Sequence, residues 1–268
     1  MLTQRNMYKI TLVISVYKNI DFLDLVLDSL SFQTFKDFEI ILSEDCAEQE
    51  LKDFISRKKN ILPFPIKHIF HEDIGFRKNI LLNRAIKQSA ADFIVFIDGD
   101  CILHKKFMES YFEFMRLADC ITGRRISLNE KMTKQILETK NSRIRTIKAI
   151  LNAECKKEIK EAFYLPFIRR KGNISILGSN FGIKKELLLK INGFDEDYLH
   201  ACIGEDVDLE MRLKKVGGVR FASIKNRAIQ YHLYHKRENS RVMEFEINKR
   251  LFEDKEKSID YRCKNGLI

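Results

Sequence analysis

Residues 91–101, ADFIVFIDGDC, constrain the fold of this chain more than any other stretch. The run Phe93–Ile97 is apolar without a break, as in a strand that a parallel sheet buries on both faces. Asp98 and Asp100 follow, and because charge is costly inside a sheet, both must lie where the strand emerges. Ligands of open α/β sheets bind at that edge, where Asp-Gly-Asp offers oxygen ligands to a divalent cation. A solvated turn is the simpler interpretation of these three residues alone, so the rest of the chain decides.

The first half of the chain alternates between expected strands and helices at the spacing of βαβ units. From Asn19, apolar residues recur with the period of a helix, which predicts a core-facing stripe of Leu23, Val26, Leu27 and Leu30. This order predicts an α/β fold: a Rossmann-like, mostly parallel central sheet with right-handed connections, flanked by helices. We expect strands at 9–17, 38–42, 66–70 and 93–97, and further helices at 48–59 and 77–89.

Composition narrows the class of protein. The chain has 268 residues, of which 45% are hydrophobic, enough for one large α/β domain, and it shows no internal repeat. No apolar run approaches the roughly 18 residues of a membrane span, and the N-terminus lacks the hydrophobic segment of a signal peptide. The 6 cysteines are scattered, without the spacing of a zinc site or a disulfide framework. These features predict a cytoplasmic protein with reduced thiols.

The net charge of +10 is concentrated in one segment. Residues 124–171 hold 14 Lys or Arg and 5 Asp or Glu, a net of +9, and we expect this insert to be mostly helical. Ile144, Ile147 and Leu151 form an apolar line among these charges. Apolar faces flanked by positive charge suit the interface of an anionic bilayer. An acceptor-binding lid and plain packing are equally open, and we expect no nucleic acid partner.

Polar side chains lie at the ends of several of the expected strands. Tyr17 follows the first strand, Asp45 follows the second, and Arg77 precedes the next helix, so they should share one sheet edge with Asp98 and Asp100. Each alone has an ordinary explanation, as a rim aromatic, a helix cap or a surface charge. Together they supply an aromatic face, carboxylates and a guanidinium, which suit a nucleotide diphosphate with a metal ion.

The second half of the chain places two acidic residues at a helix start. After a helix at 105–118 and the basic insert, we expect a strand before the turn at 178–180 and a helix that ends at 192–193. Glu205 and Asp206 open the next expected helix, where acids are favourable against the helix dipole without any further role. That helix covers 203–217, and its expected buried stripe is Leu209, Leu213 and Val216.

Two histidines three positions apart, His232 and His235, lie in the expected strand 228–237. A lone histidine is more often a core or surface residue than a metal ligand. Residues three apart point to opposite faces of a strand, so only one of the two should reach a given site.

Three stretches, VISVYKN, SLSFQTFKDFEIILSED and GFRKNILLNRAIKQSAADFIVFIDGDC, resemble the nucleotide-sugar half of family 2 glycosyltransferases of the GT-A fold. The resemblance implies that Tyr17 lies against the nucleotide base and that Asp45 bonds the base. It also implies that Asp98 reaches the ribose, that Arg77 belongs to the donor site and that Asp100 binds the metal ion.

The later sequence G-F-D-E, followed by G-E-D-x-D-L-x-x-R-L, resembles the acceptor half of the same enzymes, as in chondroitin-polymerase and galactosyltransferase-type domains. It implies that Asp206 is the catalytic base, and we assign Glu205 to the nucleotide-sugar site. The family has a histidine in this region that completes the metal site, for which we favour His232, with His235 as the alternative. Carboxylate, imidazole and phosphate ligands suit Mn²⁺ better than Ca²⁺, and Mg²⁺ is a second candidate.

The resemblance implies a metal-dependent, inverting glycosyltransferase. It would move a sugar from a nucleotide-sugar donor, with UDP expected, to a glycan or lipid-linked glycan acceptor in bacterial surface polysaccharide or lipopolysaccharide synthesis. We expect it in the cytoplasm, with peripheral binding to the inner face of the cell membrane as an option. A sugar-phosphate nucleotidyltransferase and a non-enzymatic membrane- or glycan-binding module are the alternatives. We expect one GT-A domain over 1–268, divided into a nucleotide-sugar half (9–123), the basic helical insert (124–173), an acceptor half (174–237) and a charged helical tail (238–268).

Overall fold

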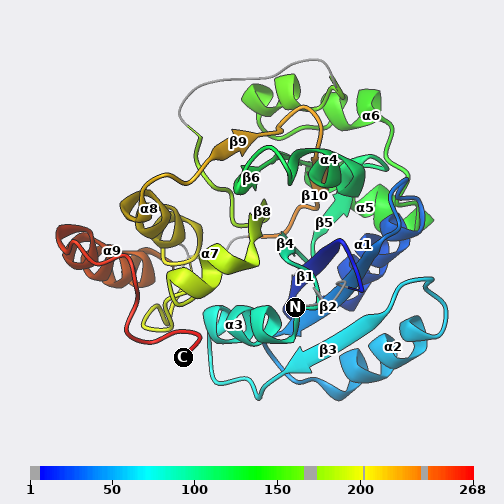
Figure 1. The fold of residues 1–268 in the computed structure, drawn as a ribbon. Coiled ribbons are helices and arrows are strands. Elements are labelled where there is room, and N and C mark those ends of the chain that lie inside the picture. Colours follow the sequence, from blue (N-terminus) through cyan, green and yellow to red (C-terminus); the bar gives the residue numbers. More distant parts are fainter. Residues whose placement is uncertain (1–6, 166–173, 202, 237–240) are drawn as a thin grey trace.

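The computed structural model describes residues 7–165, 174–201, 203–236 and 241–268. Its central sheet has the strand order β3-β2-β1-β4-β8-β6-β9 (Figure 1). Strand β1 pairs in parallel with β2 and β4, and β2 pairs in parallel with β3, whereas β8 runs antiparallel to β4 and β6. The mostly parallel α/β sheet is therefore confirmed. The strands are β1 (Ile10–Val16), β2 (Phe38–Glu44), β3 (Ile66–Phe70), β4 (Phe93–Asp98), β6 (Cys120–Thr122), β8 (Asn180–Lys184) and β9 (Phe221–Ser223).

Helices cover both faces of this sheet because alternate residues of the buried strands point to opposite sides. In β1, Leu12 and Ile14 enter one hydrophobic cluster, and Val13 enters the other. The first cluster is completed by α1 (Ile20–Ser31), α2 (Gln49–Lys59) and α4 (Phe107–Phe114). The second is completed by α3 (Lys78–Gln88), α7 (Lys185–Lys190) and α8 (Asp206–Val216).

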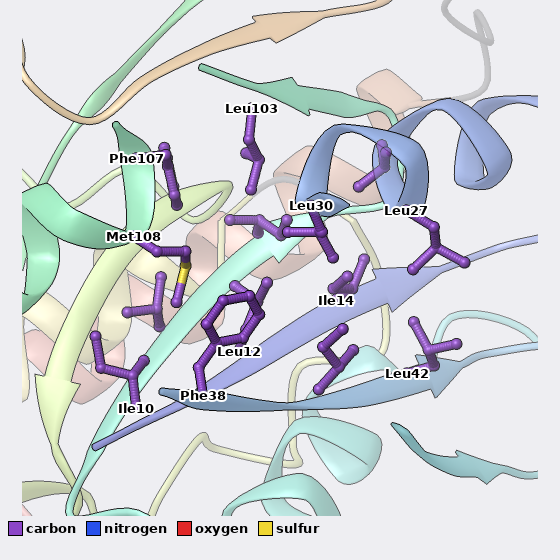
Figure 2. Close-up of a cluster of buried hydrophobic side chains, with 14 of the residues drawn as sticks. Ile10, Leu12, Ile14, Leu27, Leu30, Phe38, Leu42, Leu103, Phe107 and Met108 are labelled. Carbon is purple, nitrogen blue, oxygen red and sulfur yellow. The ribbon is translucent and has the colours of Figure 1, made fainter. Parts of the chain in front are cut away.

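Figure 2 shows the first cluster, where side chains of β1 and β2 meet α1 and α4. Leu27 and Leu30 of the predicted apolar stripe are fully buried there. The helix begins where the sequence predicts, because the Asn19 side chain accepts a hydrogen bond of 3.0 Å from the Phe22 N–H. Each fully buried Leu contributes about 1.5–3 kcal/mol to folding, so this layer holds the strand ends in fixed positions.

A second, three-stranded sheet lies beside the first. It consists of β5 (Cys101–Leu103), β10 (Ile229–His232) and β7 (Arg124–Ser127) in the order β5-β10-β7. Strand β5 starts directly after Asp100, so this sheet brings the end of β10 to the Asp-Gly-Asp sequence. It packs against α5 (Glu130–Thr139) and α6 (Thr146–Leu151), and the 3₁₀ helix η1 (Lys156–Glu161) follows.

Some segments differ from the sequence-based expectations. The residues before the turn at 178–180 are not a strand; the strand is β8, which follows the turn. Side chains replace a neighbouring strand there, because the Ile176 N–H donates to Glu210 and the Leu177 N–H donates to Thr122. The basic segment also begins with a strand, β7, before its helices.

The C-terminal tail is helical as predicted, with α9 at Arg241–Lys257. In the parts of the chain that the structure describes, we find no helix with the length and apolarity needed to cross a membrane.

Candidate active site

The Asp-Gly-Asp sequence lies at the carboxyl end of β4, beside the end of the parallel strand β1. The Gly99 N–H donates to the Ser15 carbonyl at 2.8 Å. A Cβ atom at this position would lie 3.0 Å from that oxygen, so glycine permits this close approach to β1. The side chains of Asp98 and Asp100 stay 27% and 21% exposed, which leaves both carboxylates open to a ligand.

Asp100 forms a cluster with both of the predicted histidines. Its Oδ2 atom lies 3.3 Å from His232 Nε2 and 3.4 Å from His235 Nε2. The sheet register explains the first contact, because His232 pairs with Cys101, the residue after Asp100. Burial alone would raise the pKa of Asp100, but hydrogen bonds to the two imidazoles hold it well below its usual range.

The two histidines do not point apart, contrary to the expectation from strand geometry. Strand β10 ends at His232, so the alternation of a strand does not extend to His235. One ligand atom from each of Asp100, His232 and His235 lies within 4.8 Å of the others. A carboxylate with two imidazoles is a donor set that fits Mn²⁺ or another transition metal.

Lys78 connects the strand end of the first half to the acidic helix start of the second half. Its Nζ atom lies 2.9 Å from Asp98 Oδ1 and 2.6 Å from Glu205 Oε2. Burial alone would lower the pKa of Lys78, but attraction to the two carboxylates outweighs this effect and raises it. Burial raises the pKa of Glu205, although Lys78 opposes that shift.

Asp206 is the first residue of α8, next to Glu205 in the N-cap position. One carboxylate oxygen of Asp206 accepts a hydrogen bond of 2.7 Å from the Gly178 N–H. Gly204 precedes this pair with a φ of 127°, a conformation that strongly favours glycine. The Gly204 carbonyl accepts a hydrogen bond of 2.9 Å from the Asn79 side chain of α3, which fixes the helix start against the first half.

Asp45 and Tyr17 lie near the ends of β2 and β1. Asp45 accepts a hydrogen bond of 2.9 Å from the Arg77 N–H, and its other oxygen lies 2.8 Å from His71 Nε2. Burial raises the pKa of Asp45. The Tyr17 side chain is 57% exposed and its hydroxyl lies 3.4 Å from Asp73, so an aromatic face is accessible beside a polar rim.

The structure places the predicted residues in three contact groups: Asp98 with Glu205 through Lys78, Asp100 with the two histidines, and Asp45 with Arg77. Arg77 contacts Asp45 through its main-chain N–H, while its guanidinium donates to the Phe76 carbonyl at 2.8 Å. The cation between the carboxylates is the next residue, Lys78, which the sequence interpretation missed. A lysine at the first position of a helix is unfavourable against the helix dipole, and this signal could have indicated acidic partners.

The same interpretation also missed the histidines beside β2. His71 faces Asp45, and His68 lies 2.6 Å from the buried Glu44 carboxylate. Burial would raise the pKa of Glu44, but the hydrogen bond to His68 and the one from the Glu48 N–H lower it. These contacts fix the loop that carries Asp45.

Two characterised relatives are similar to part of this chain. Validoxylamine A glucosyltransferase of Streptomyces hygroscopicus subsp. jinggangensis is 27% identical over 103 residues, which covers 38% of this chain and 24% of the relative. Poly(ribitol-phosphate) β-N-acetylglucosaminyltransferase TarS of Staphylococcus aureus is 23% identical over 111 residues, which covers 41% of this chain and 19% of TarS. The matches thus span a quarter or less of each relative.

Solved structures share the fold over most of the chain. The S. aureus TarS fragment 1–349 in complex with UDP-GlcNAc has a TM-score of 0.63 at 17% identity and covers 91% of this chain and 65% of that chain. The mannosyltransferase PcManGT from Pyrobaculum calidifontis, in complex with GDP-Man and Mn²⁺, has a TM-score of 0.59 at 14% identity and covers 87% of this chain and 59% of that chain.

The sequence model of glycosyl transferase family 2 matches residues 11–191, which is more than half of the chain. This match contains the strand ends that carry Tyr17, Asp45, Asp98 and Asp100. Together with the shared architecture of the solved structures, it shows that the chain has the GT-A fold and belongs to glycosyl transferase family 2.

Proposed function

We propose that this chain is a metal-dependent, inverting glycosyltransferase that uses a nucleotide-sugar donor, with UDP as the nucleotide. The observation that carries the proposal is the Lys78 contact between Asp98 and Glu205. This contact brings the acidic end of β4 and the start of α8 into one site. A nucleotidyltransferase needs acidic metal ligands, but it does not need an acceptor-side carboxylate of this kind.

The donor would lie along the carboxyl ends of β1, β2 and β4. We assign the base to the exposed face of Tyr17 and to Asp45, and the ribose to Asp98. Arg77 and Glu205 complete our assignment of the nucleotide-sugar site, with Lys78 added from the structure. The choice of UDP is supported by the solved complexes of TarS with UDP and with UDP-GlcNAc.

Asp100, His232 and His235 are the residues that we propose hold a divalent metal ion. Imidazole ligands favour Mn²⁺, and Mg²⁺ is the second candidate. The PcManGT complex with Mn²⁺ is in line with this choice. When bound, such an ion supplies Lewis-acid stabilisation to the departing diphosphate.

Asp206 is our candidate for the catalytic base. Glycosyl transfer passes through an oxocarbenium-like state, and the attacking acceptor hydroxyl must lose its proton. In this proposal the Asp206 carboxylate takes that proton, while the N–H groups of Gly178 and Val207 hold it in place. Attack from the face opposite the diphosphate inverts the anomeric configuration.

The acceptor that we propose is a glycan or lipid-linked glycan, as in the synthesis of bacterial surface polysaccharide or lipopolysaccharide. In that role the protein works in the cytoplasm, at the inner face of the cell membrane. The proposal treats residues 1–268 as one functional unit.

Thermal unfolding against a panel of nucleotides and nucleotide sugars, with and without Mn²⁺, tests the donor and the metal. A ligand that binds only the native state raises its stability, by about 2.7 kcal/mol at a hundred times its Kd. We expect a Mn²⁺-dependent shift with UDP and with one UDP-sugar. No shift with any nucleotide would contradict the proposal, and pyrophosphate release from a nucleoside triphosphate with a sugar phosphate would favour the nucleotidyltransferase.

A further inference from the structure

Large apolar side chains are exposed on the outer side of residues 143–165. Ile147 is 72% exposed and Leu151 is 77% exposed, and they lie one turn apart on α6. Phe163 and Leu165, which follow η1, are 47% and 38% exposed. In Figure 1, α6 lies at the upper edge of the molecule.

The side chains are exposed although the rest of the segment is packed against a core. Ala149, on the same helix, is fully buried in the cluster that covers the second sheet, and Ile144 and Ile150 pack against that cluster. One side of α6 is therefore anchored through Ala149 and Ile150, while Ile147 and Leu151 are mostly exposed. Of the apolar line predicted from the sequence, Ile144 belongs to the core and the other two belong to the surface.

The charges around these apolar residues are strongly positive. Of the acids in this segment, Glu158 turns inward, where it accepts a hydrogen bond of 2.6 Å from the Ser127 N–H. Glu161 pairs with Lys225 at 3.4 Å, and Glu154 alone is exposed. The exposed cations of the segment are Arg143, Arg145, Lys148, Lys156, Lys157 and Lys160.

We propose that this basic-apolar face, formed by the exposed residues of 143–165, binds the surface of an anionic lipid bilayer. Lysine and arginine attract anionic headgroups, and exposed Ile, Leu and Phe gain free energy by entering the boundary between headgroups and acyl chains. The phosphates of a nucleic acid would pair with the cations, but a nucleic acid would offer no apolar surface to Ile147 and Leu151 on α6. The inference rests on the proposed function, because it places the enzyme where a lipid-linked acceptor lies.

Co-sedimentation with vesicles tests this face directly. We expect the wild-type protein to bind vesicles of phosphatidylcholine with about 30% phosphatidylglycerol at least about tenfold more strongly than pure phosphatidylcholine vesicles, and less strongly as salt rises. The apolar variant Ile147→Gln/Leu151→Gln and the charge variant Lys156→Glu/Lys157→Glu should each lose about tenfold in binding to the anionic vesicles.

Two control variants on α9 carry the same chemical changes at exposed sites. Met243→Gln/Ile247→Gln matches the apolar variant, and Lys249→Glu/Arg250→Glu matches the charge variant. The controls should bind like the wild type, and all variants should keep its melting temperature. Equal losses in test and control variants, or full binding by both test variants, would overturn the proposal.

If binding depended on the cations alone and an oligonucleotide abolished it, the face would be a general polyanion site. That result would reject the proposal that it binds a bilayer. Vesicle binding needs no turnover, so this test can fail while the donor and metal assays succeed. Conversely, the face can bind bilayers even if the donor panel gives no shift.

Discussion

The Asp206 carboxylate can be changed to an amide that keeps its contact with the Gly178 N–H and gives up the one with the Val207 N–H. In Asp206→Asn the side-chain oxygen still accepts from the Gly178 N–H, but the amide cannot take a proton. We expect turnover of the selected nucleotide sugar to fall about 10²–10⁴-fold, while nucleotide-induced thermal stabilisation stays near that of the wild type. The readout is the rate of nucleotide diphosphate release.

The protein with Asp206→Asn should melt within a few degrees of the wild type, which serves as the folding control. Turnover within a few-fold of the wild type would show that another group accepts the proton. Loss of nucleotide stabilisation would instead place Asp206 in the donor site.

The second prediction concerns the stability of the protein without Lys78, because its removal leaves two carboxylates without their cation. In Lys78→Met, Asp98 and the partly buried Glu205 lose their shared cation, and breaking such a partly buried pair costs up to about 3 kcal/mol of folding free energy. Urea unfolding should show this loss, and Lys78→Arg should recover part of it because the guanidinium keeps the charge.

The neighbouring Arg77→Met is the matched control. Its guanidinium donates to a main-chain carbonyl, so its loss should cost much less stability than the loss of Lys78. Equal effects of the two substitutions on the unfolding free energy would reject the bridging role of Lys78.

At the level of single residues, the sequence predicted the position of side chains that lie directly at the end of a strand or helix. Asp98 and Asp100 could be placed because a buried strand cannot hold them. Lys78 could not be placed as a bridge, because its partner Glu205 lies far along the chain, in a helix whose position depends on the whole sheet. His235 was misjudged because the end of β10 was not visible in the sequence.

At the scale of the elements, a titratable side chain, His104, lies where residues 124–165 pack beside β5. His104 follows β5, and its ring stacks on Tyr164 with the centroids 5.5 Å apart. Its Nδ1 atom accepts a hydrogen bond of 3.3 Å from the Lys106 N–H. Burial lowers the pKa of His104 to about 4, and the charges of Lys105 and Lys106 add to the effect.

This lowered pKa predicts a pH dependence of stability. The unfolded chain binds more protons than the native state between the ordinary histidine pKa of about 6.5 and the folded value. The His104 contribution is therefore fully present above about pH 6.5 and is lost as the pH falls toward 4. Because the ring is partly exposed, we expect a loss on the order of 1–2 kcal/mol.

Urea unfolding at several pH values checks the contribution of His104. In His104→Asn the side chain can still accept a hydrogen bond but does not titrate, so the variant should lose less stability than the wild type between pH 6.5 and 4. Curves of equal slope for the two proteins would show that other groups cause the acid sensitivity.

Long elements were easier to predict than short ones. The apolar runs of β1 and β4 and the stripe of α1 extend over enough residues to show a period. Strands such as β5 and β6 have 3 residues each, too few for any pattern, and exist because partners from distant parts of the chain pair with them. Residues 174–177 were wrongly predicted as a strand, since Ile176 is buried through side-chain contacts and not through pairing.

Over the whole molecule, distant segments hold the helix start that carries Glu205 and Asp206. From one side, Asn79 of α3 donates to the carbonyls of Asp195 and Gly204 at 2.7 and 2.9 Å. From the other side, α9 contributes Asn248, whose amide lies 2.7 Å from the His200 carbonyl and 2.6 Å from the Ile203 carbonyl. The C-terminal helix, to which the sequence assigned no chemistry, thus supports the site from outside it.

Asn248→Ala tests this support across the molecule. Asn248 is 1% exposed, so its removal leaves main-chain carbonyls without a partner, at a cost of about 2–3 kcal/mol in urea unfolding. We expect turnover to fall more than nucleotide binding, because the loop before Glu205 is displaced while the strand ends of the proposed donor site remain. The exposed neighbour provides the control, since Lys249→Ala should change stability by no more than about 0.5 kcal/mol. If Asn248→Ala behaved like Lys249→Ala, α9 would be dispensable for the geometry of the site.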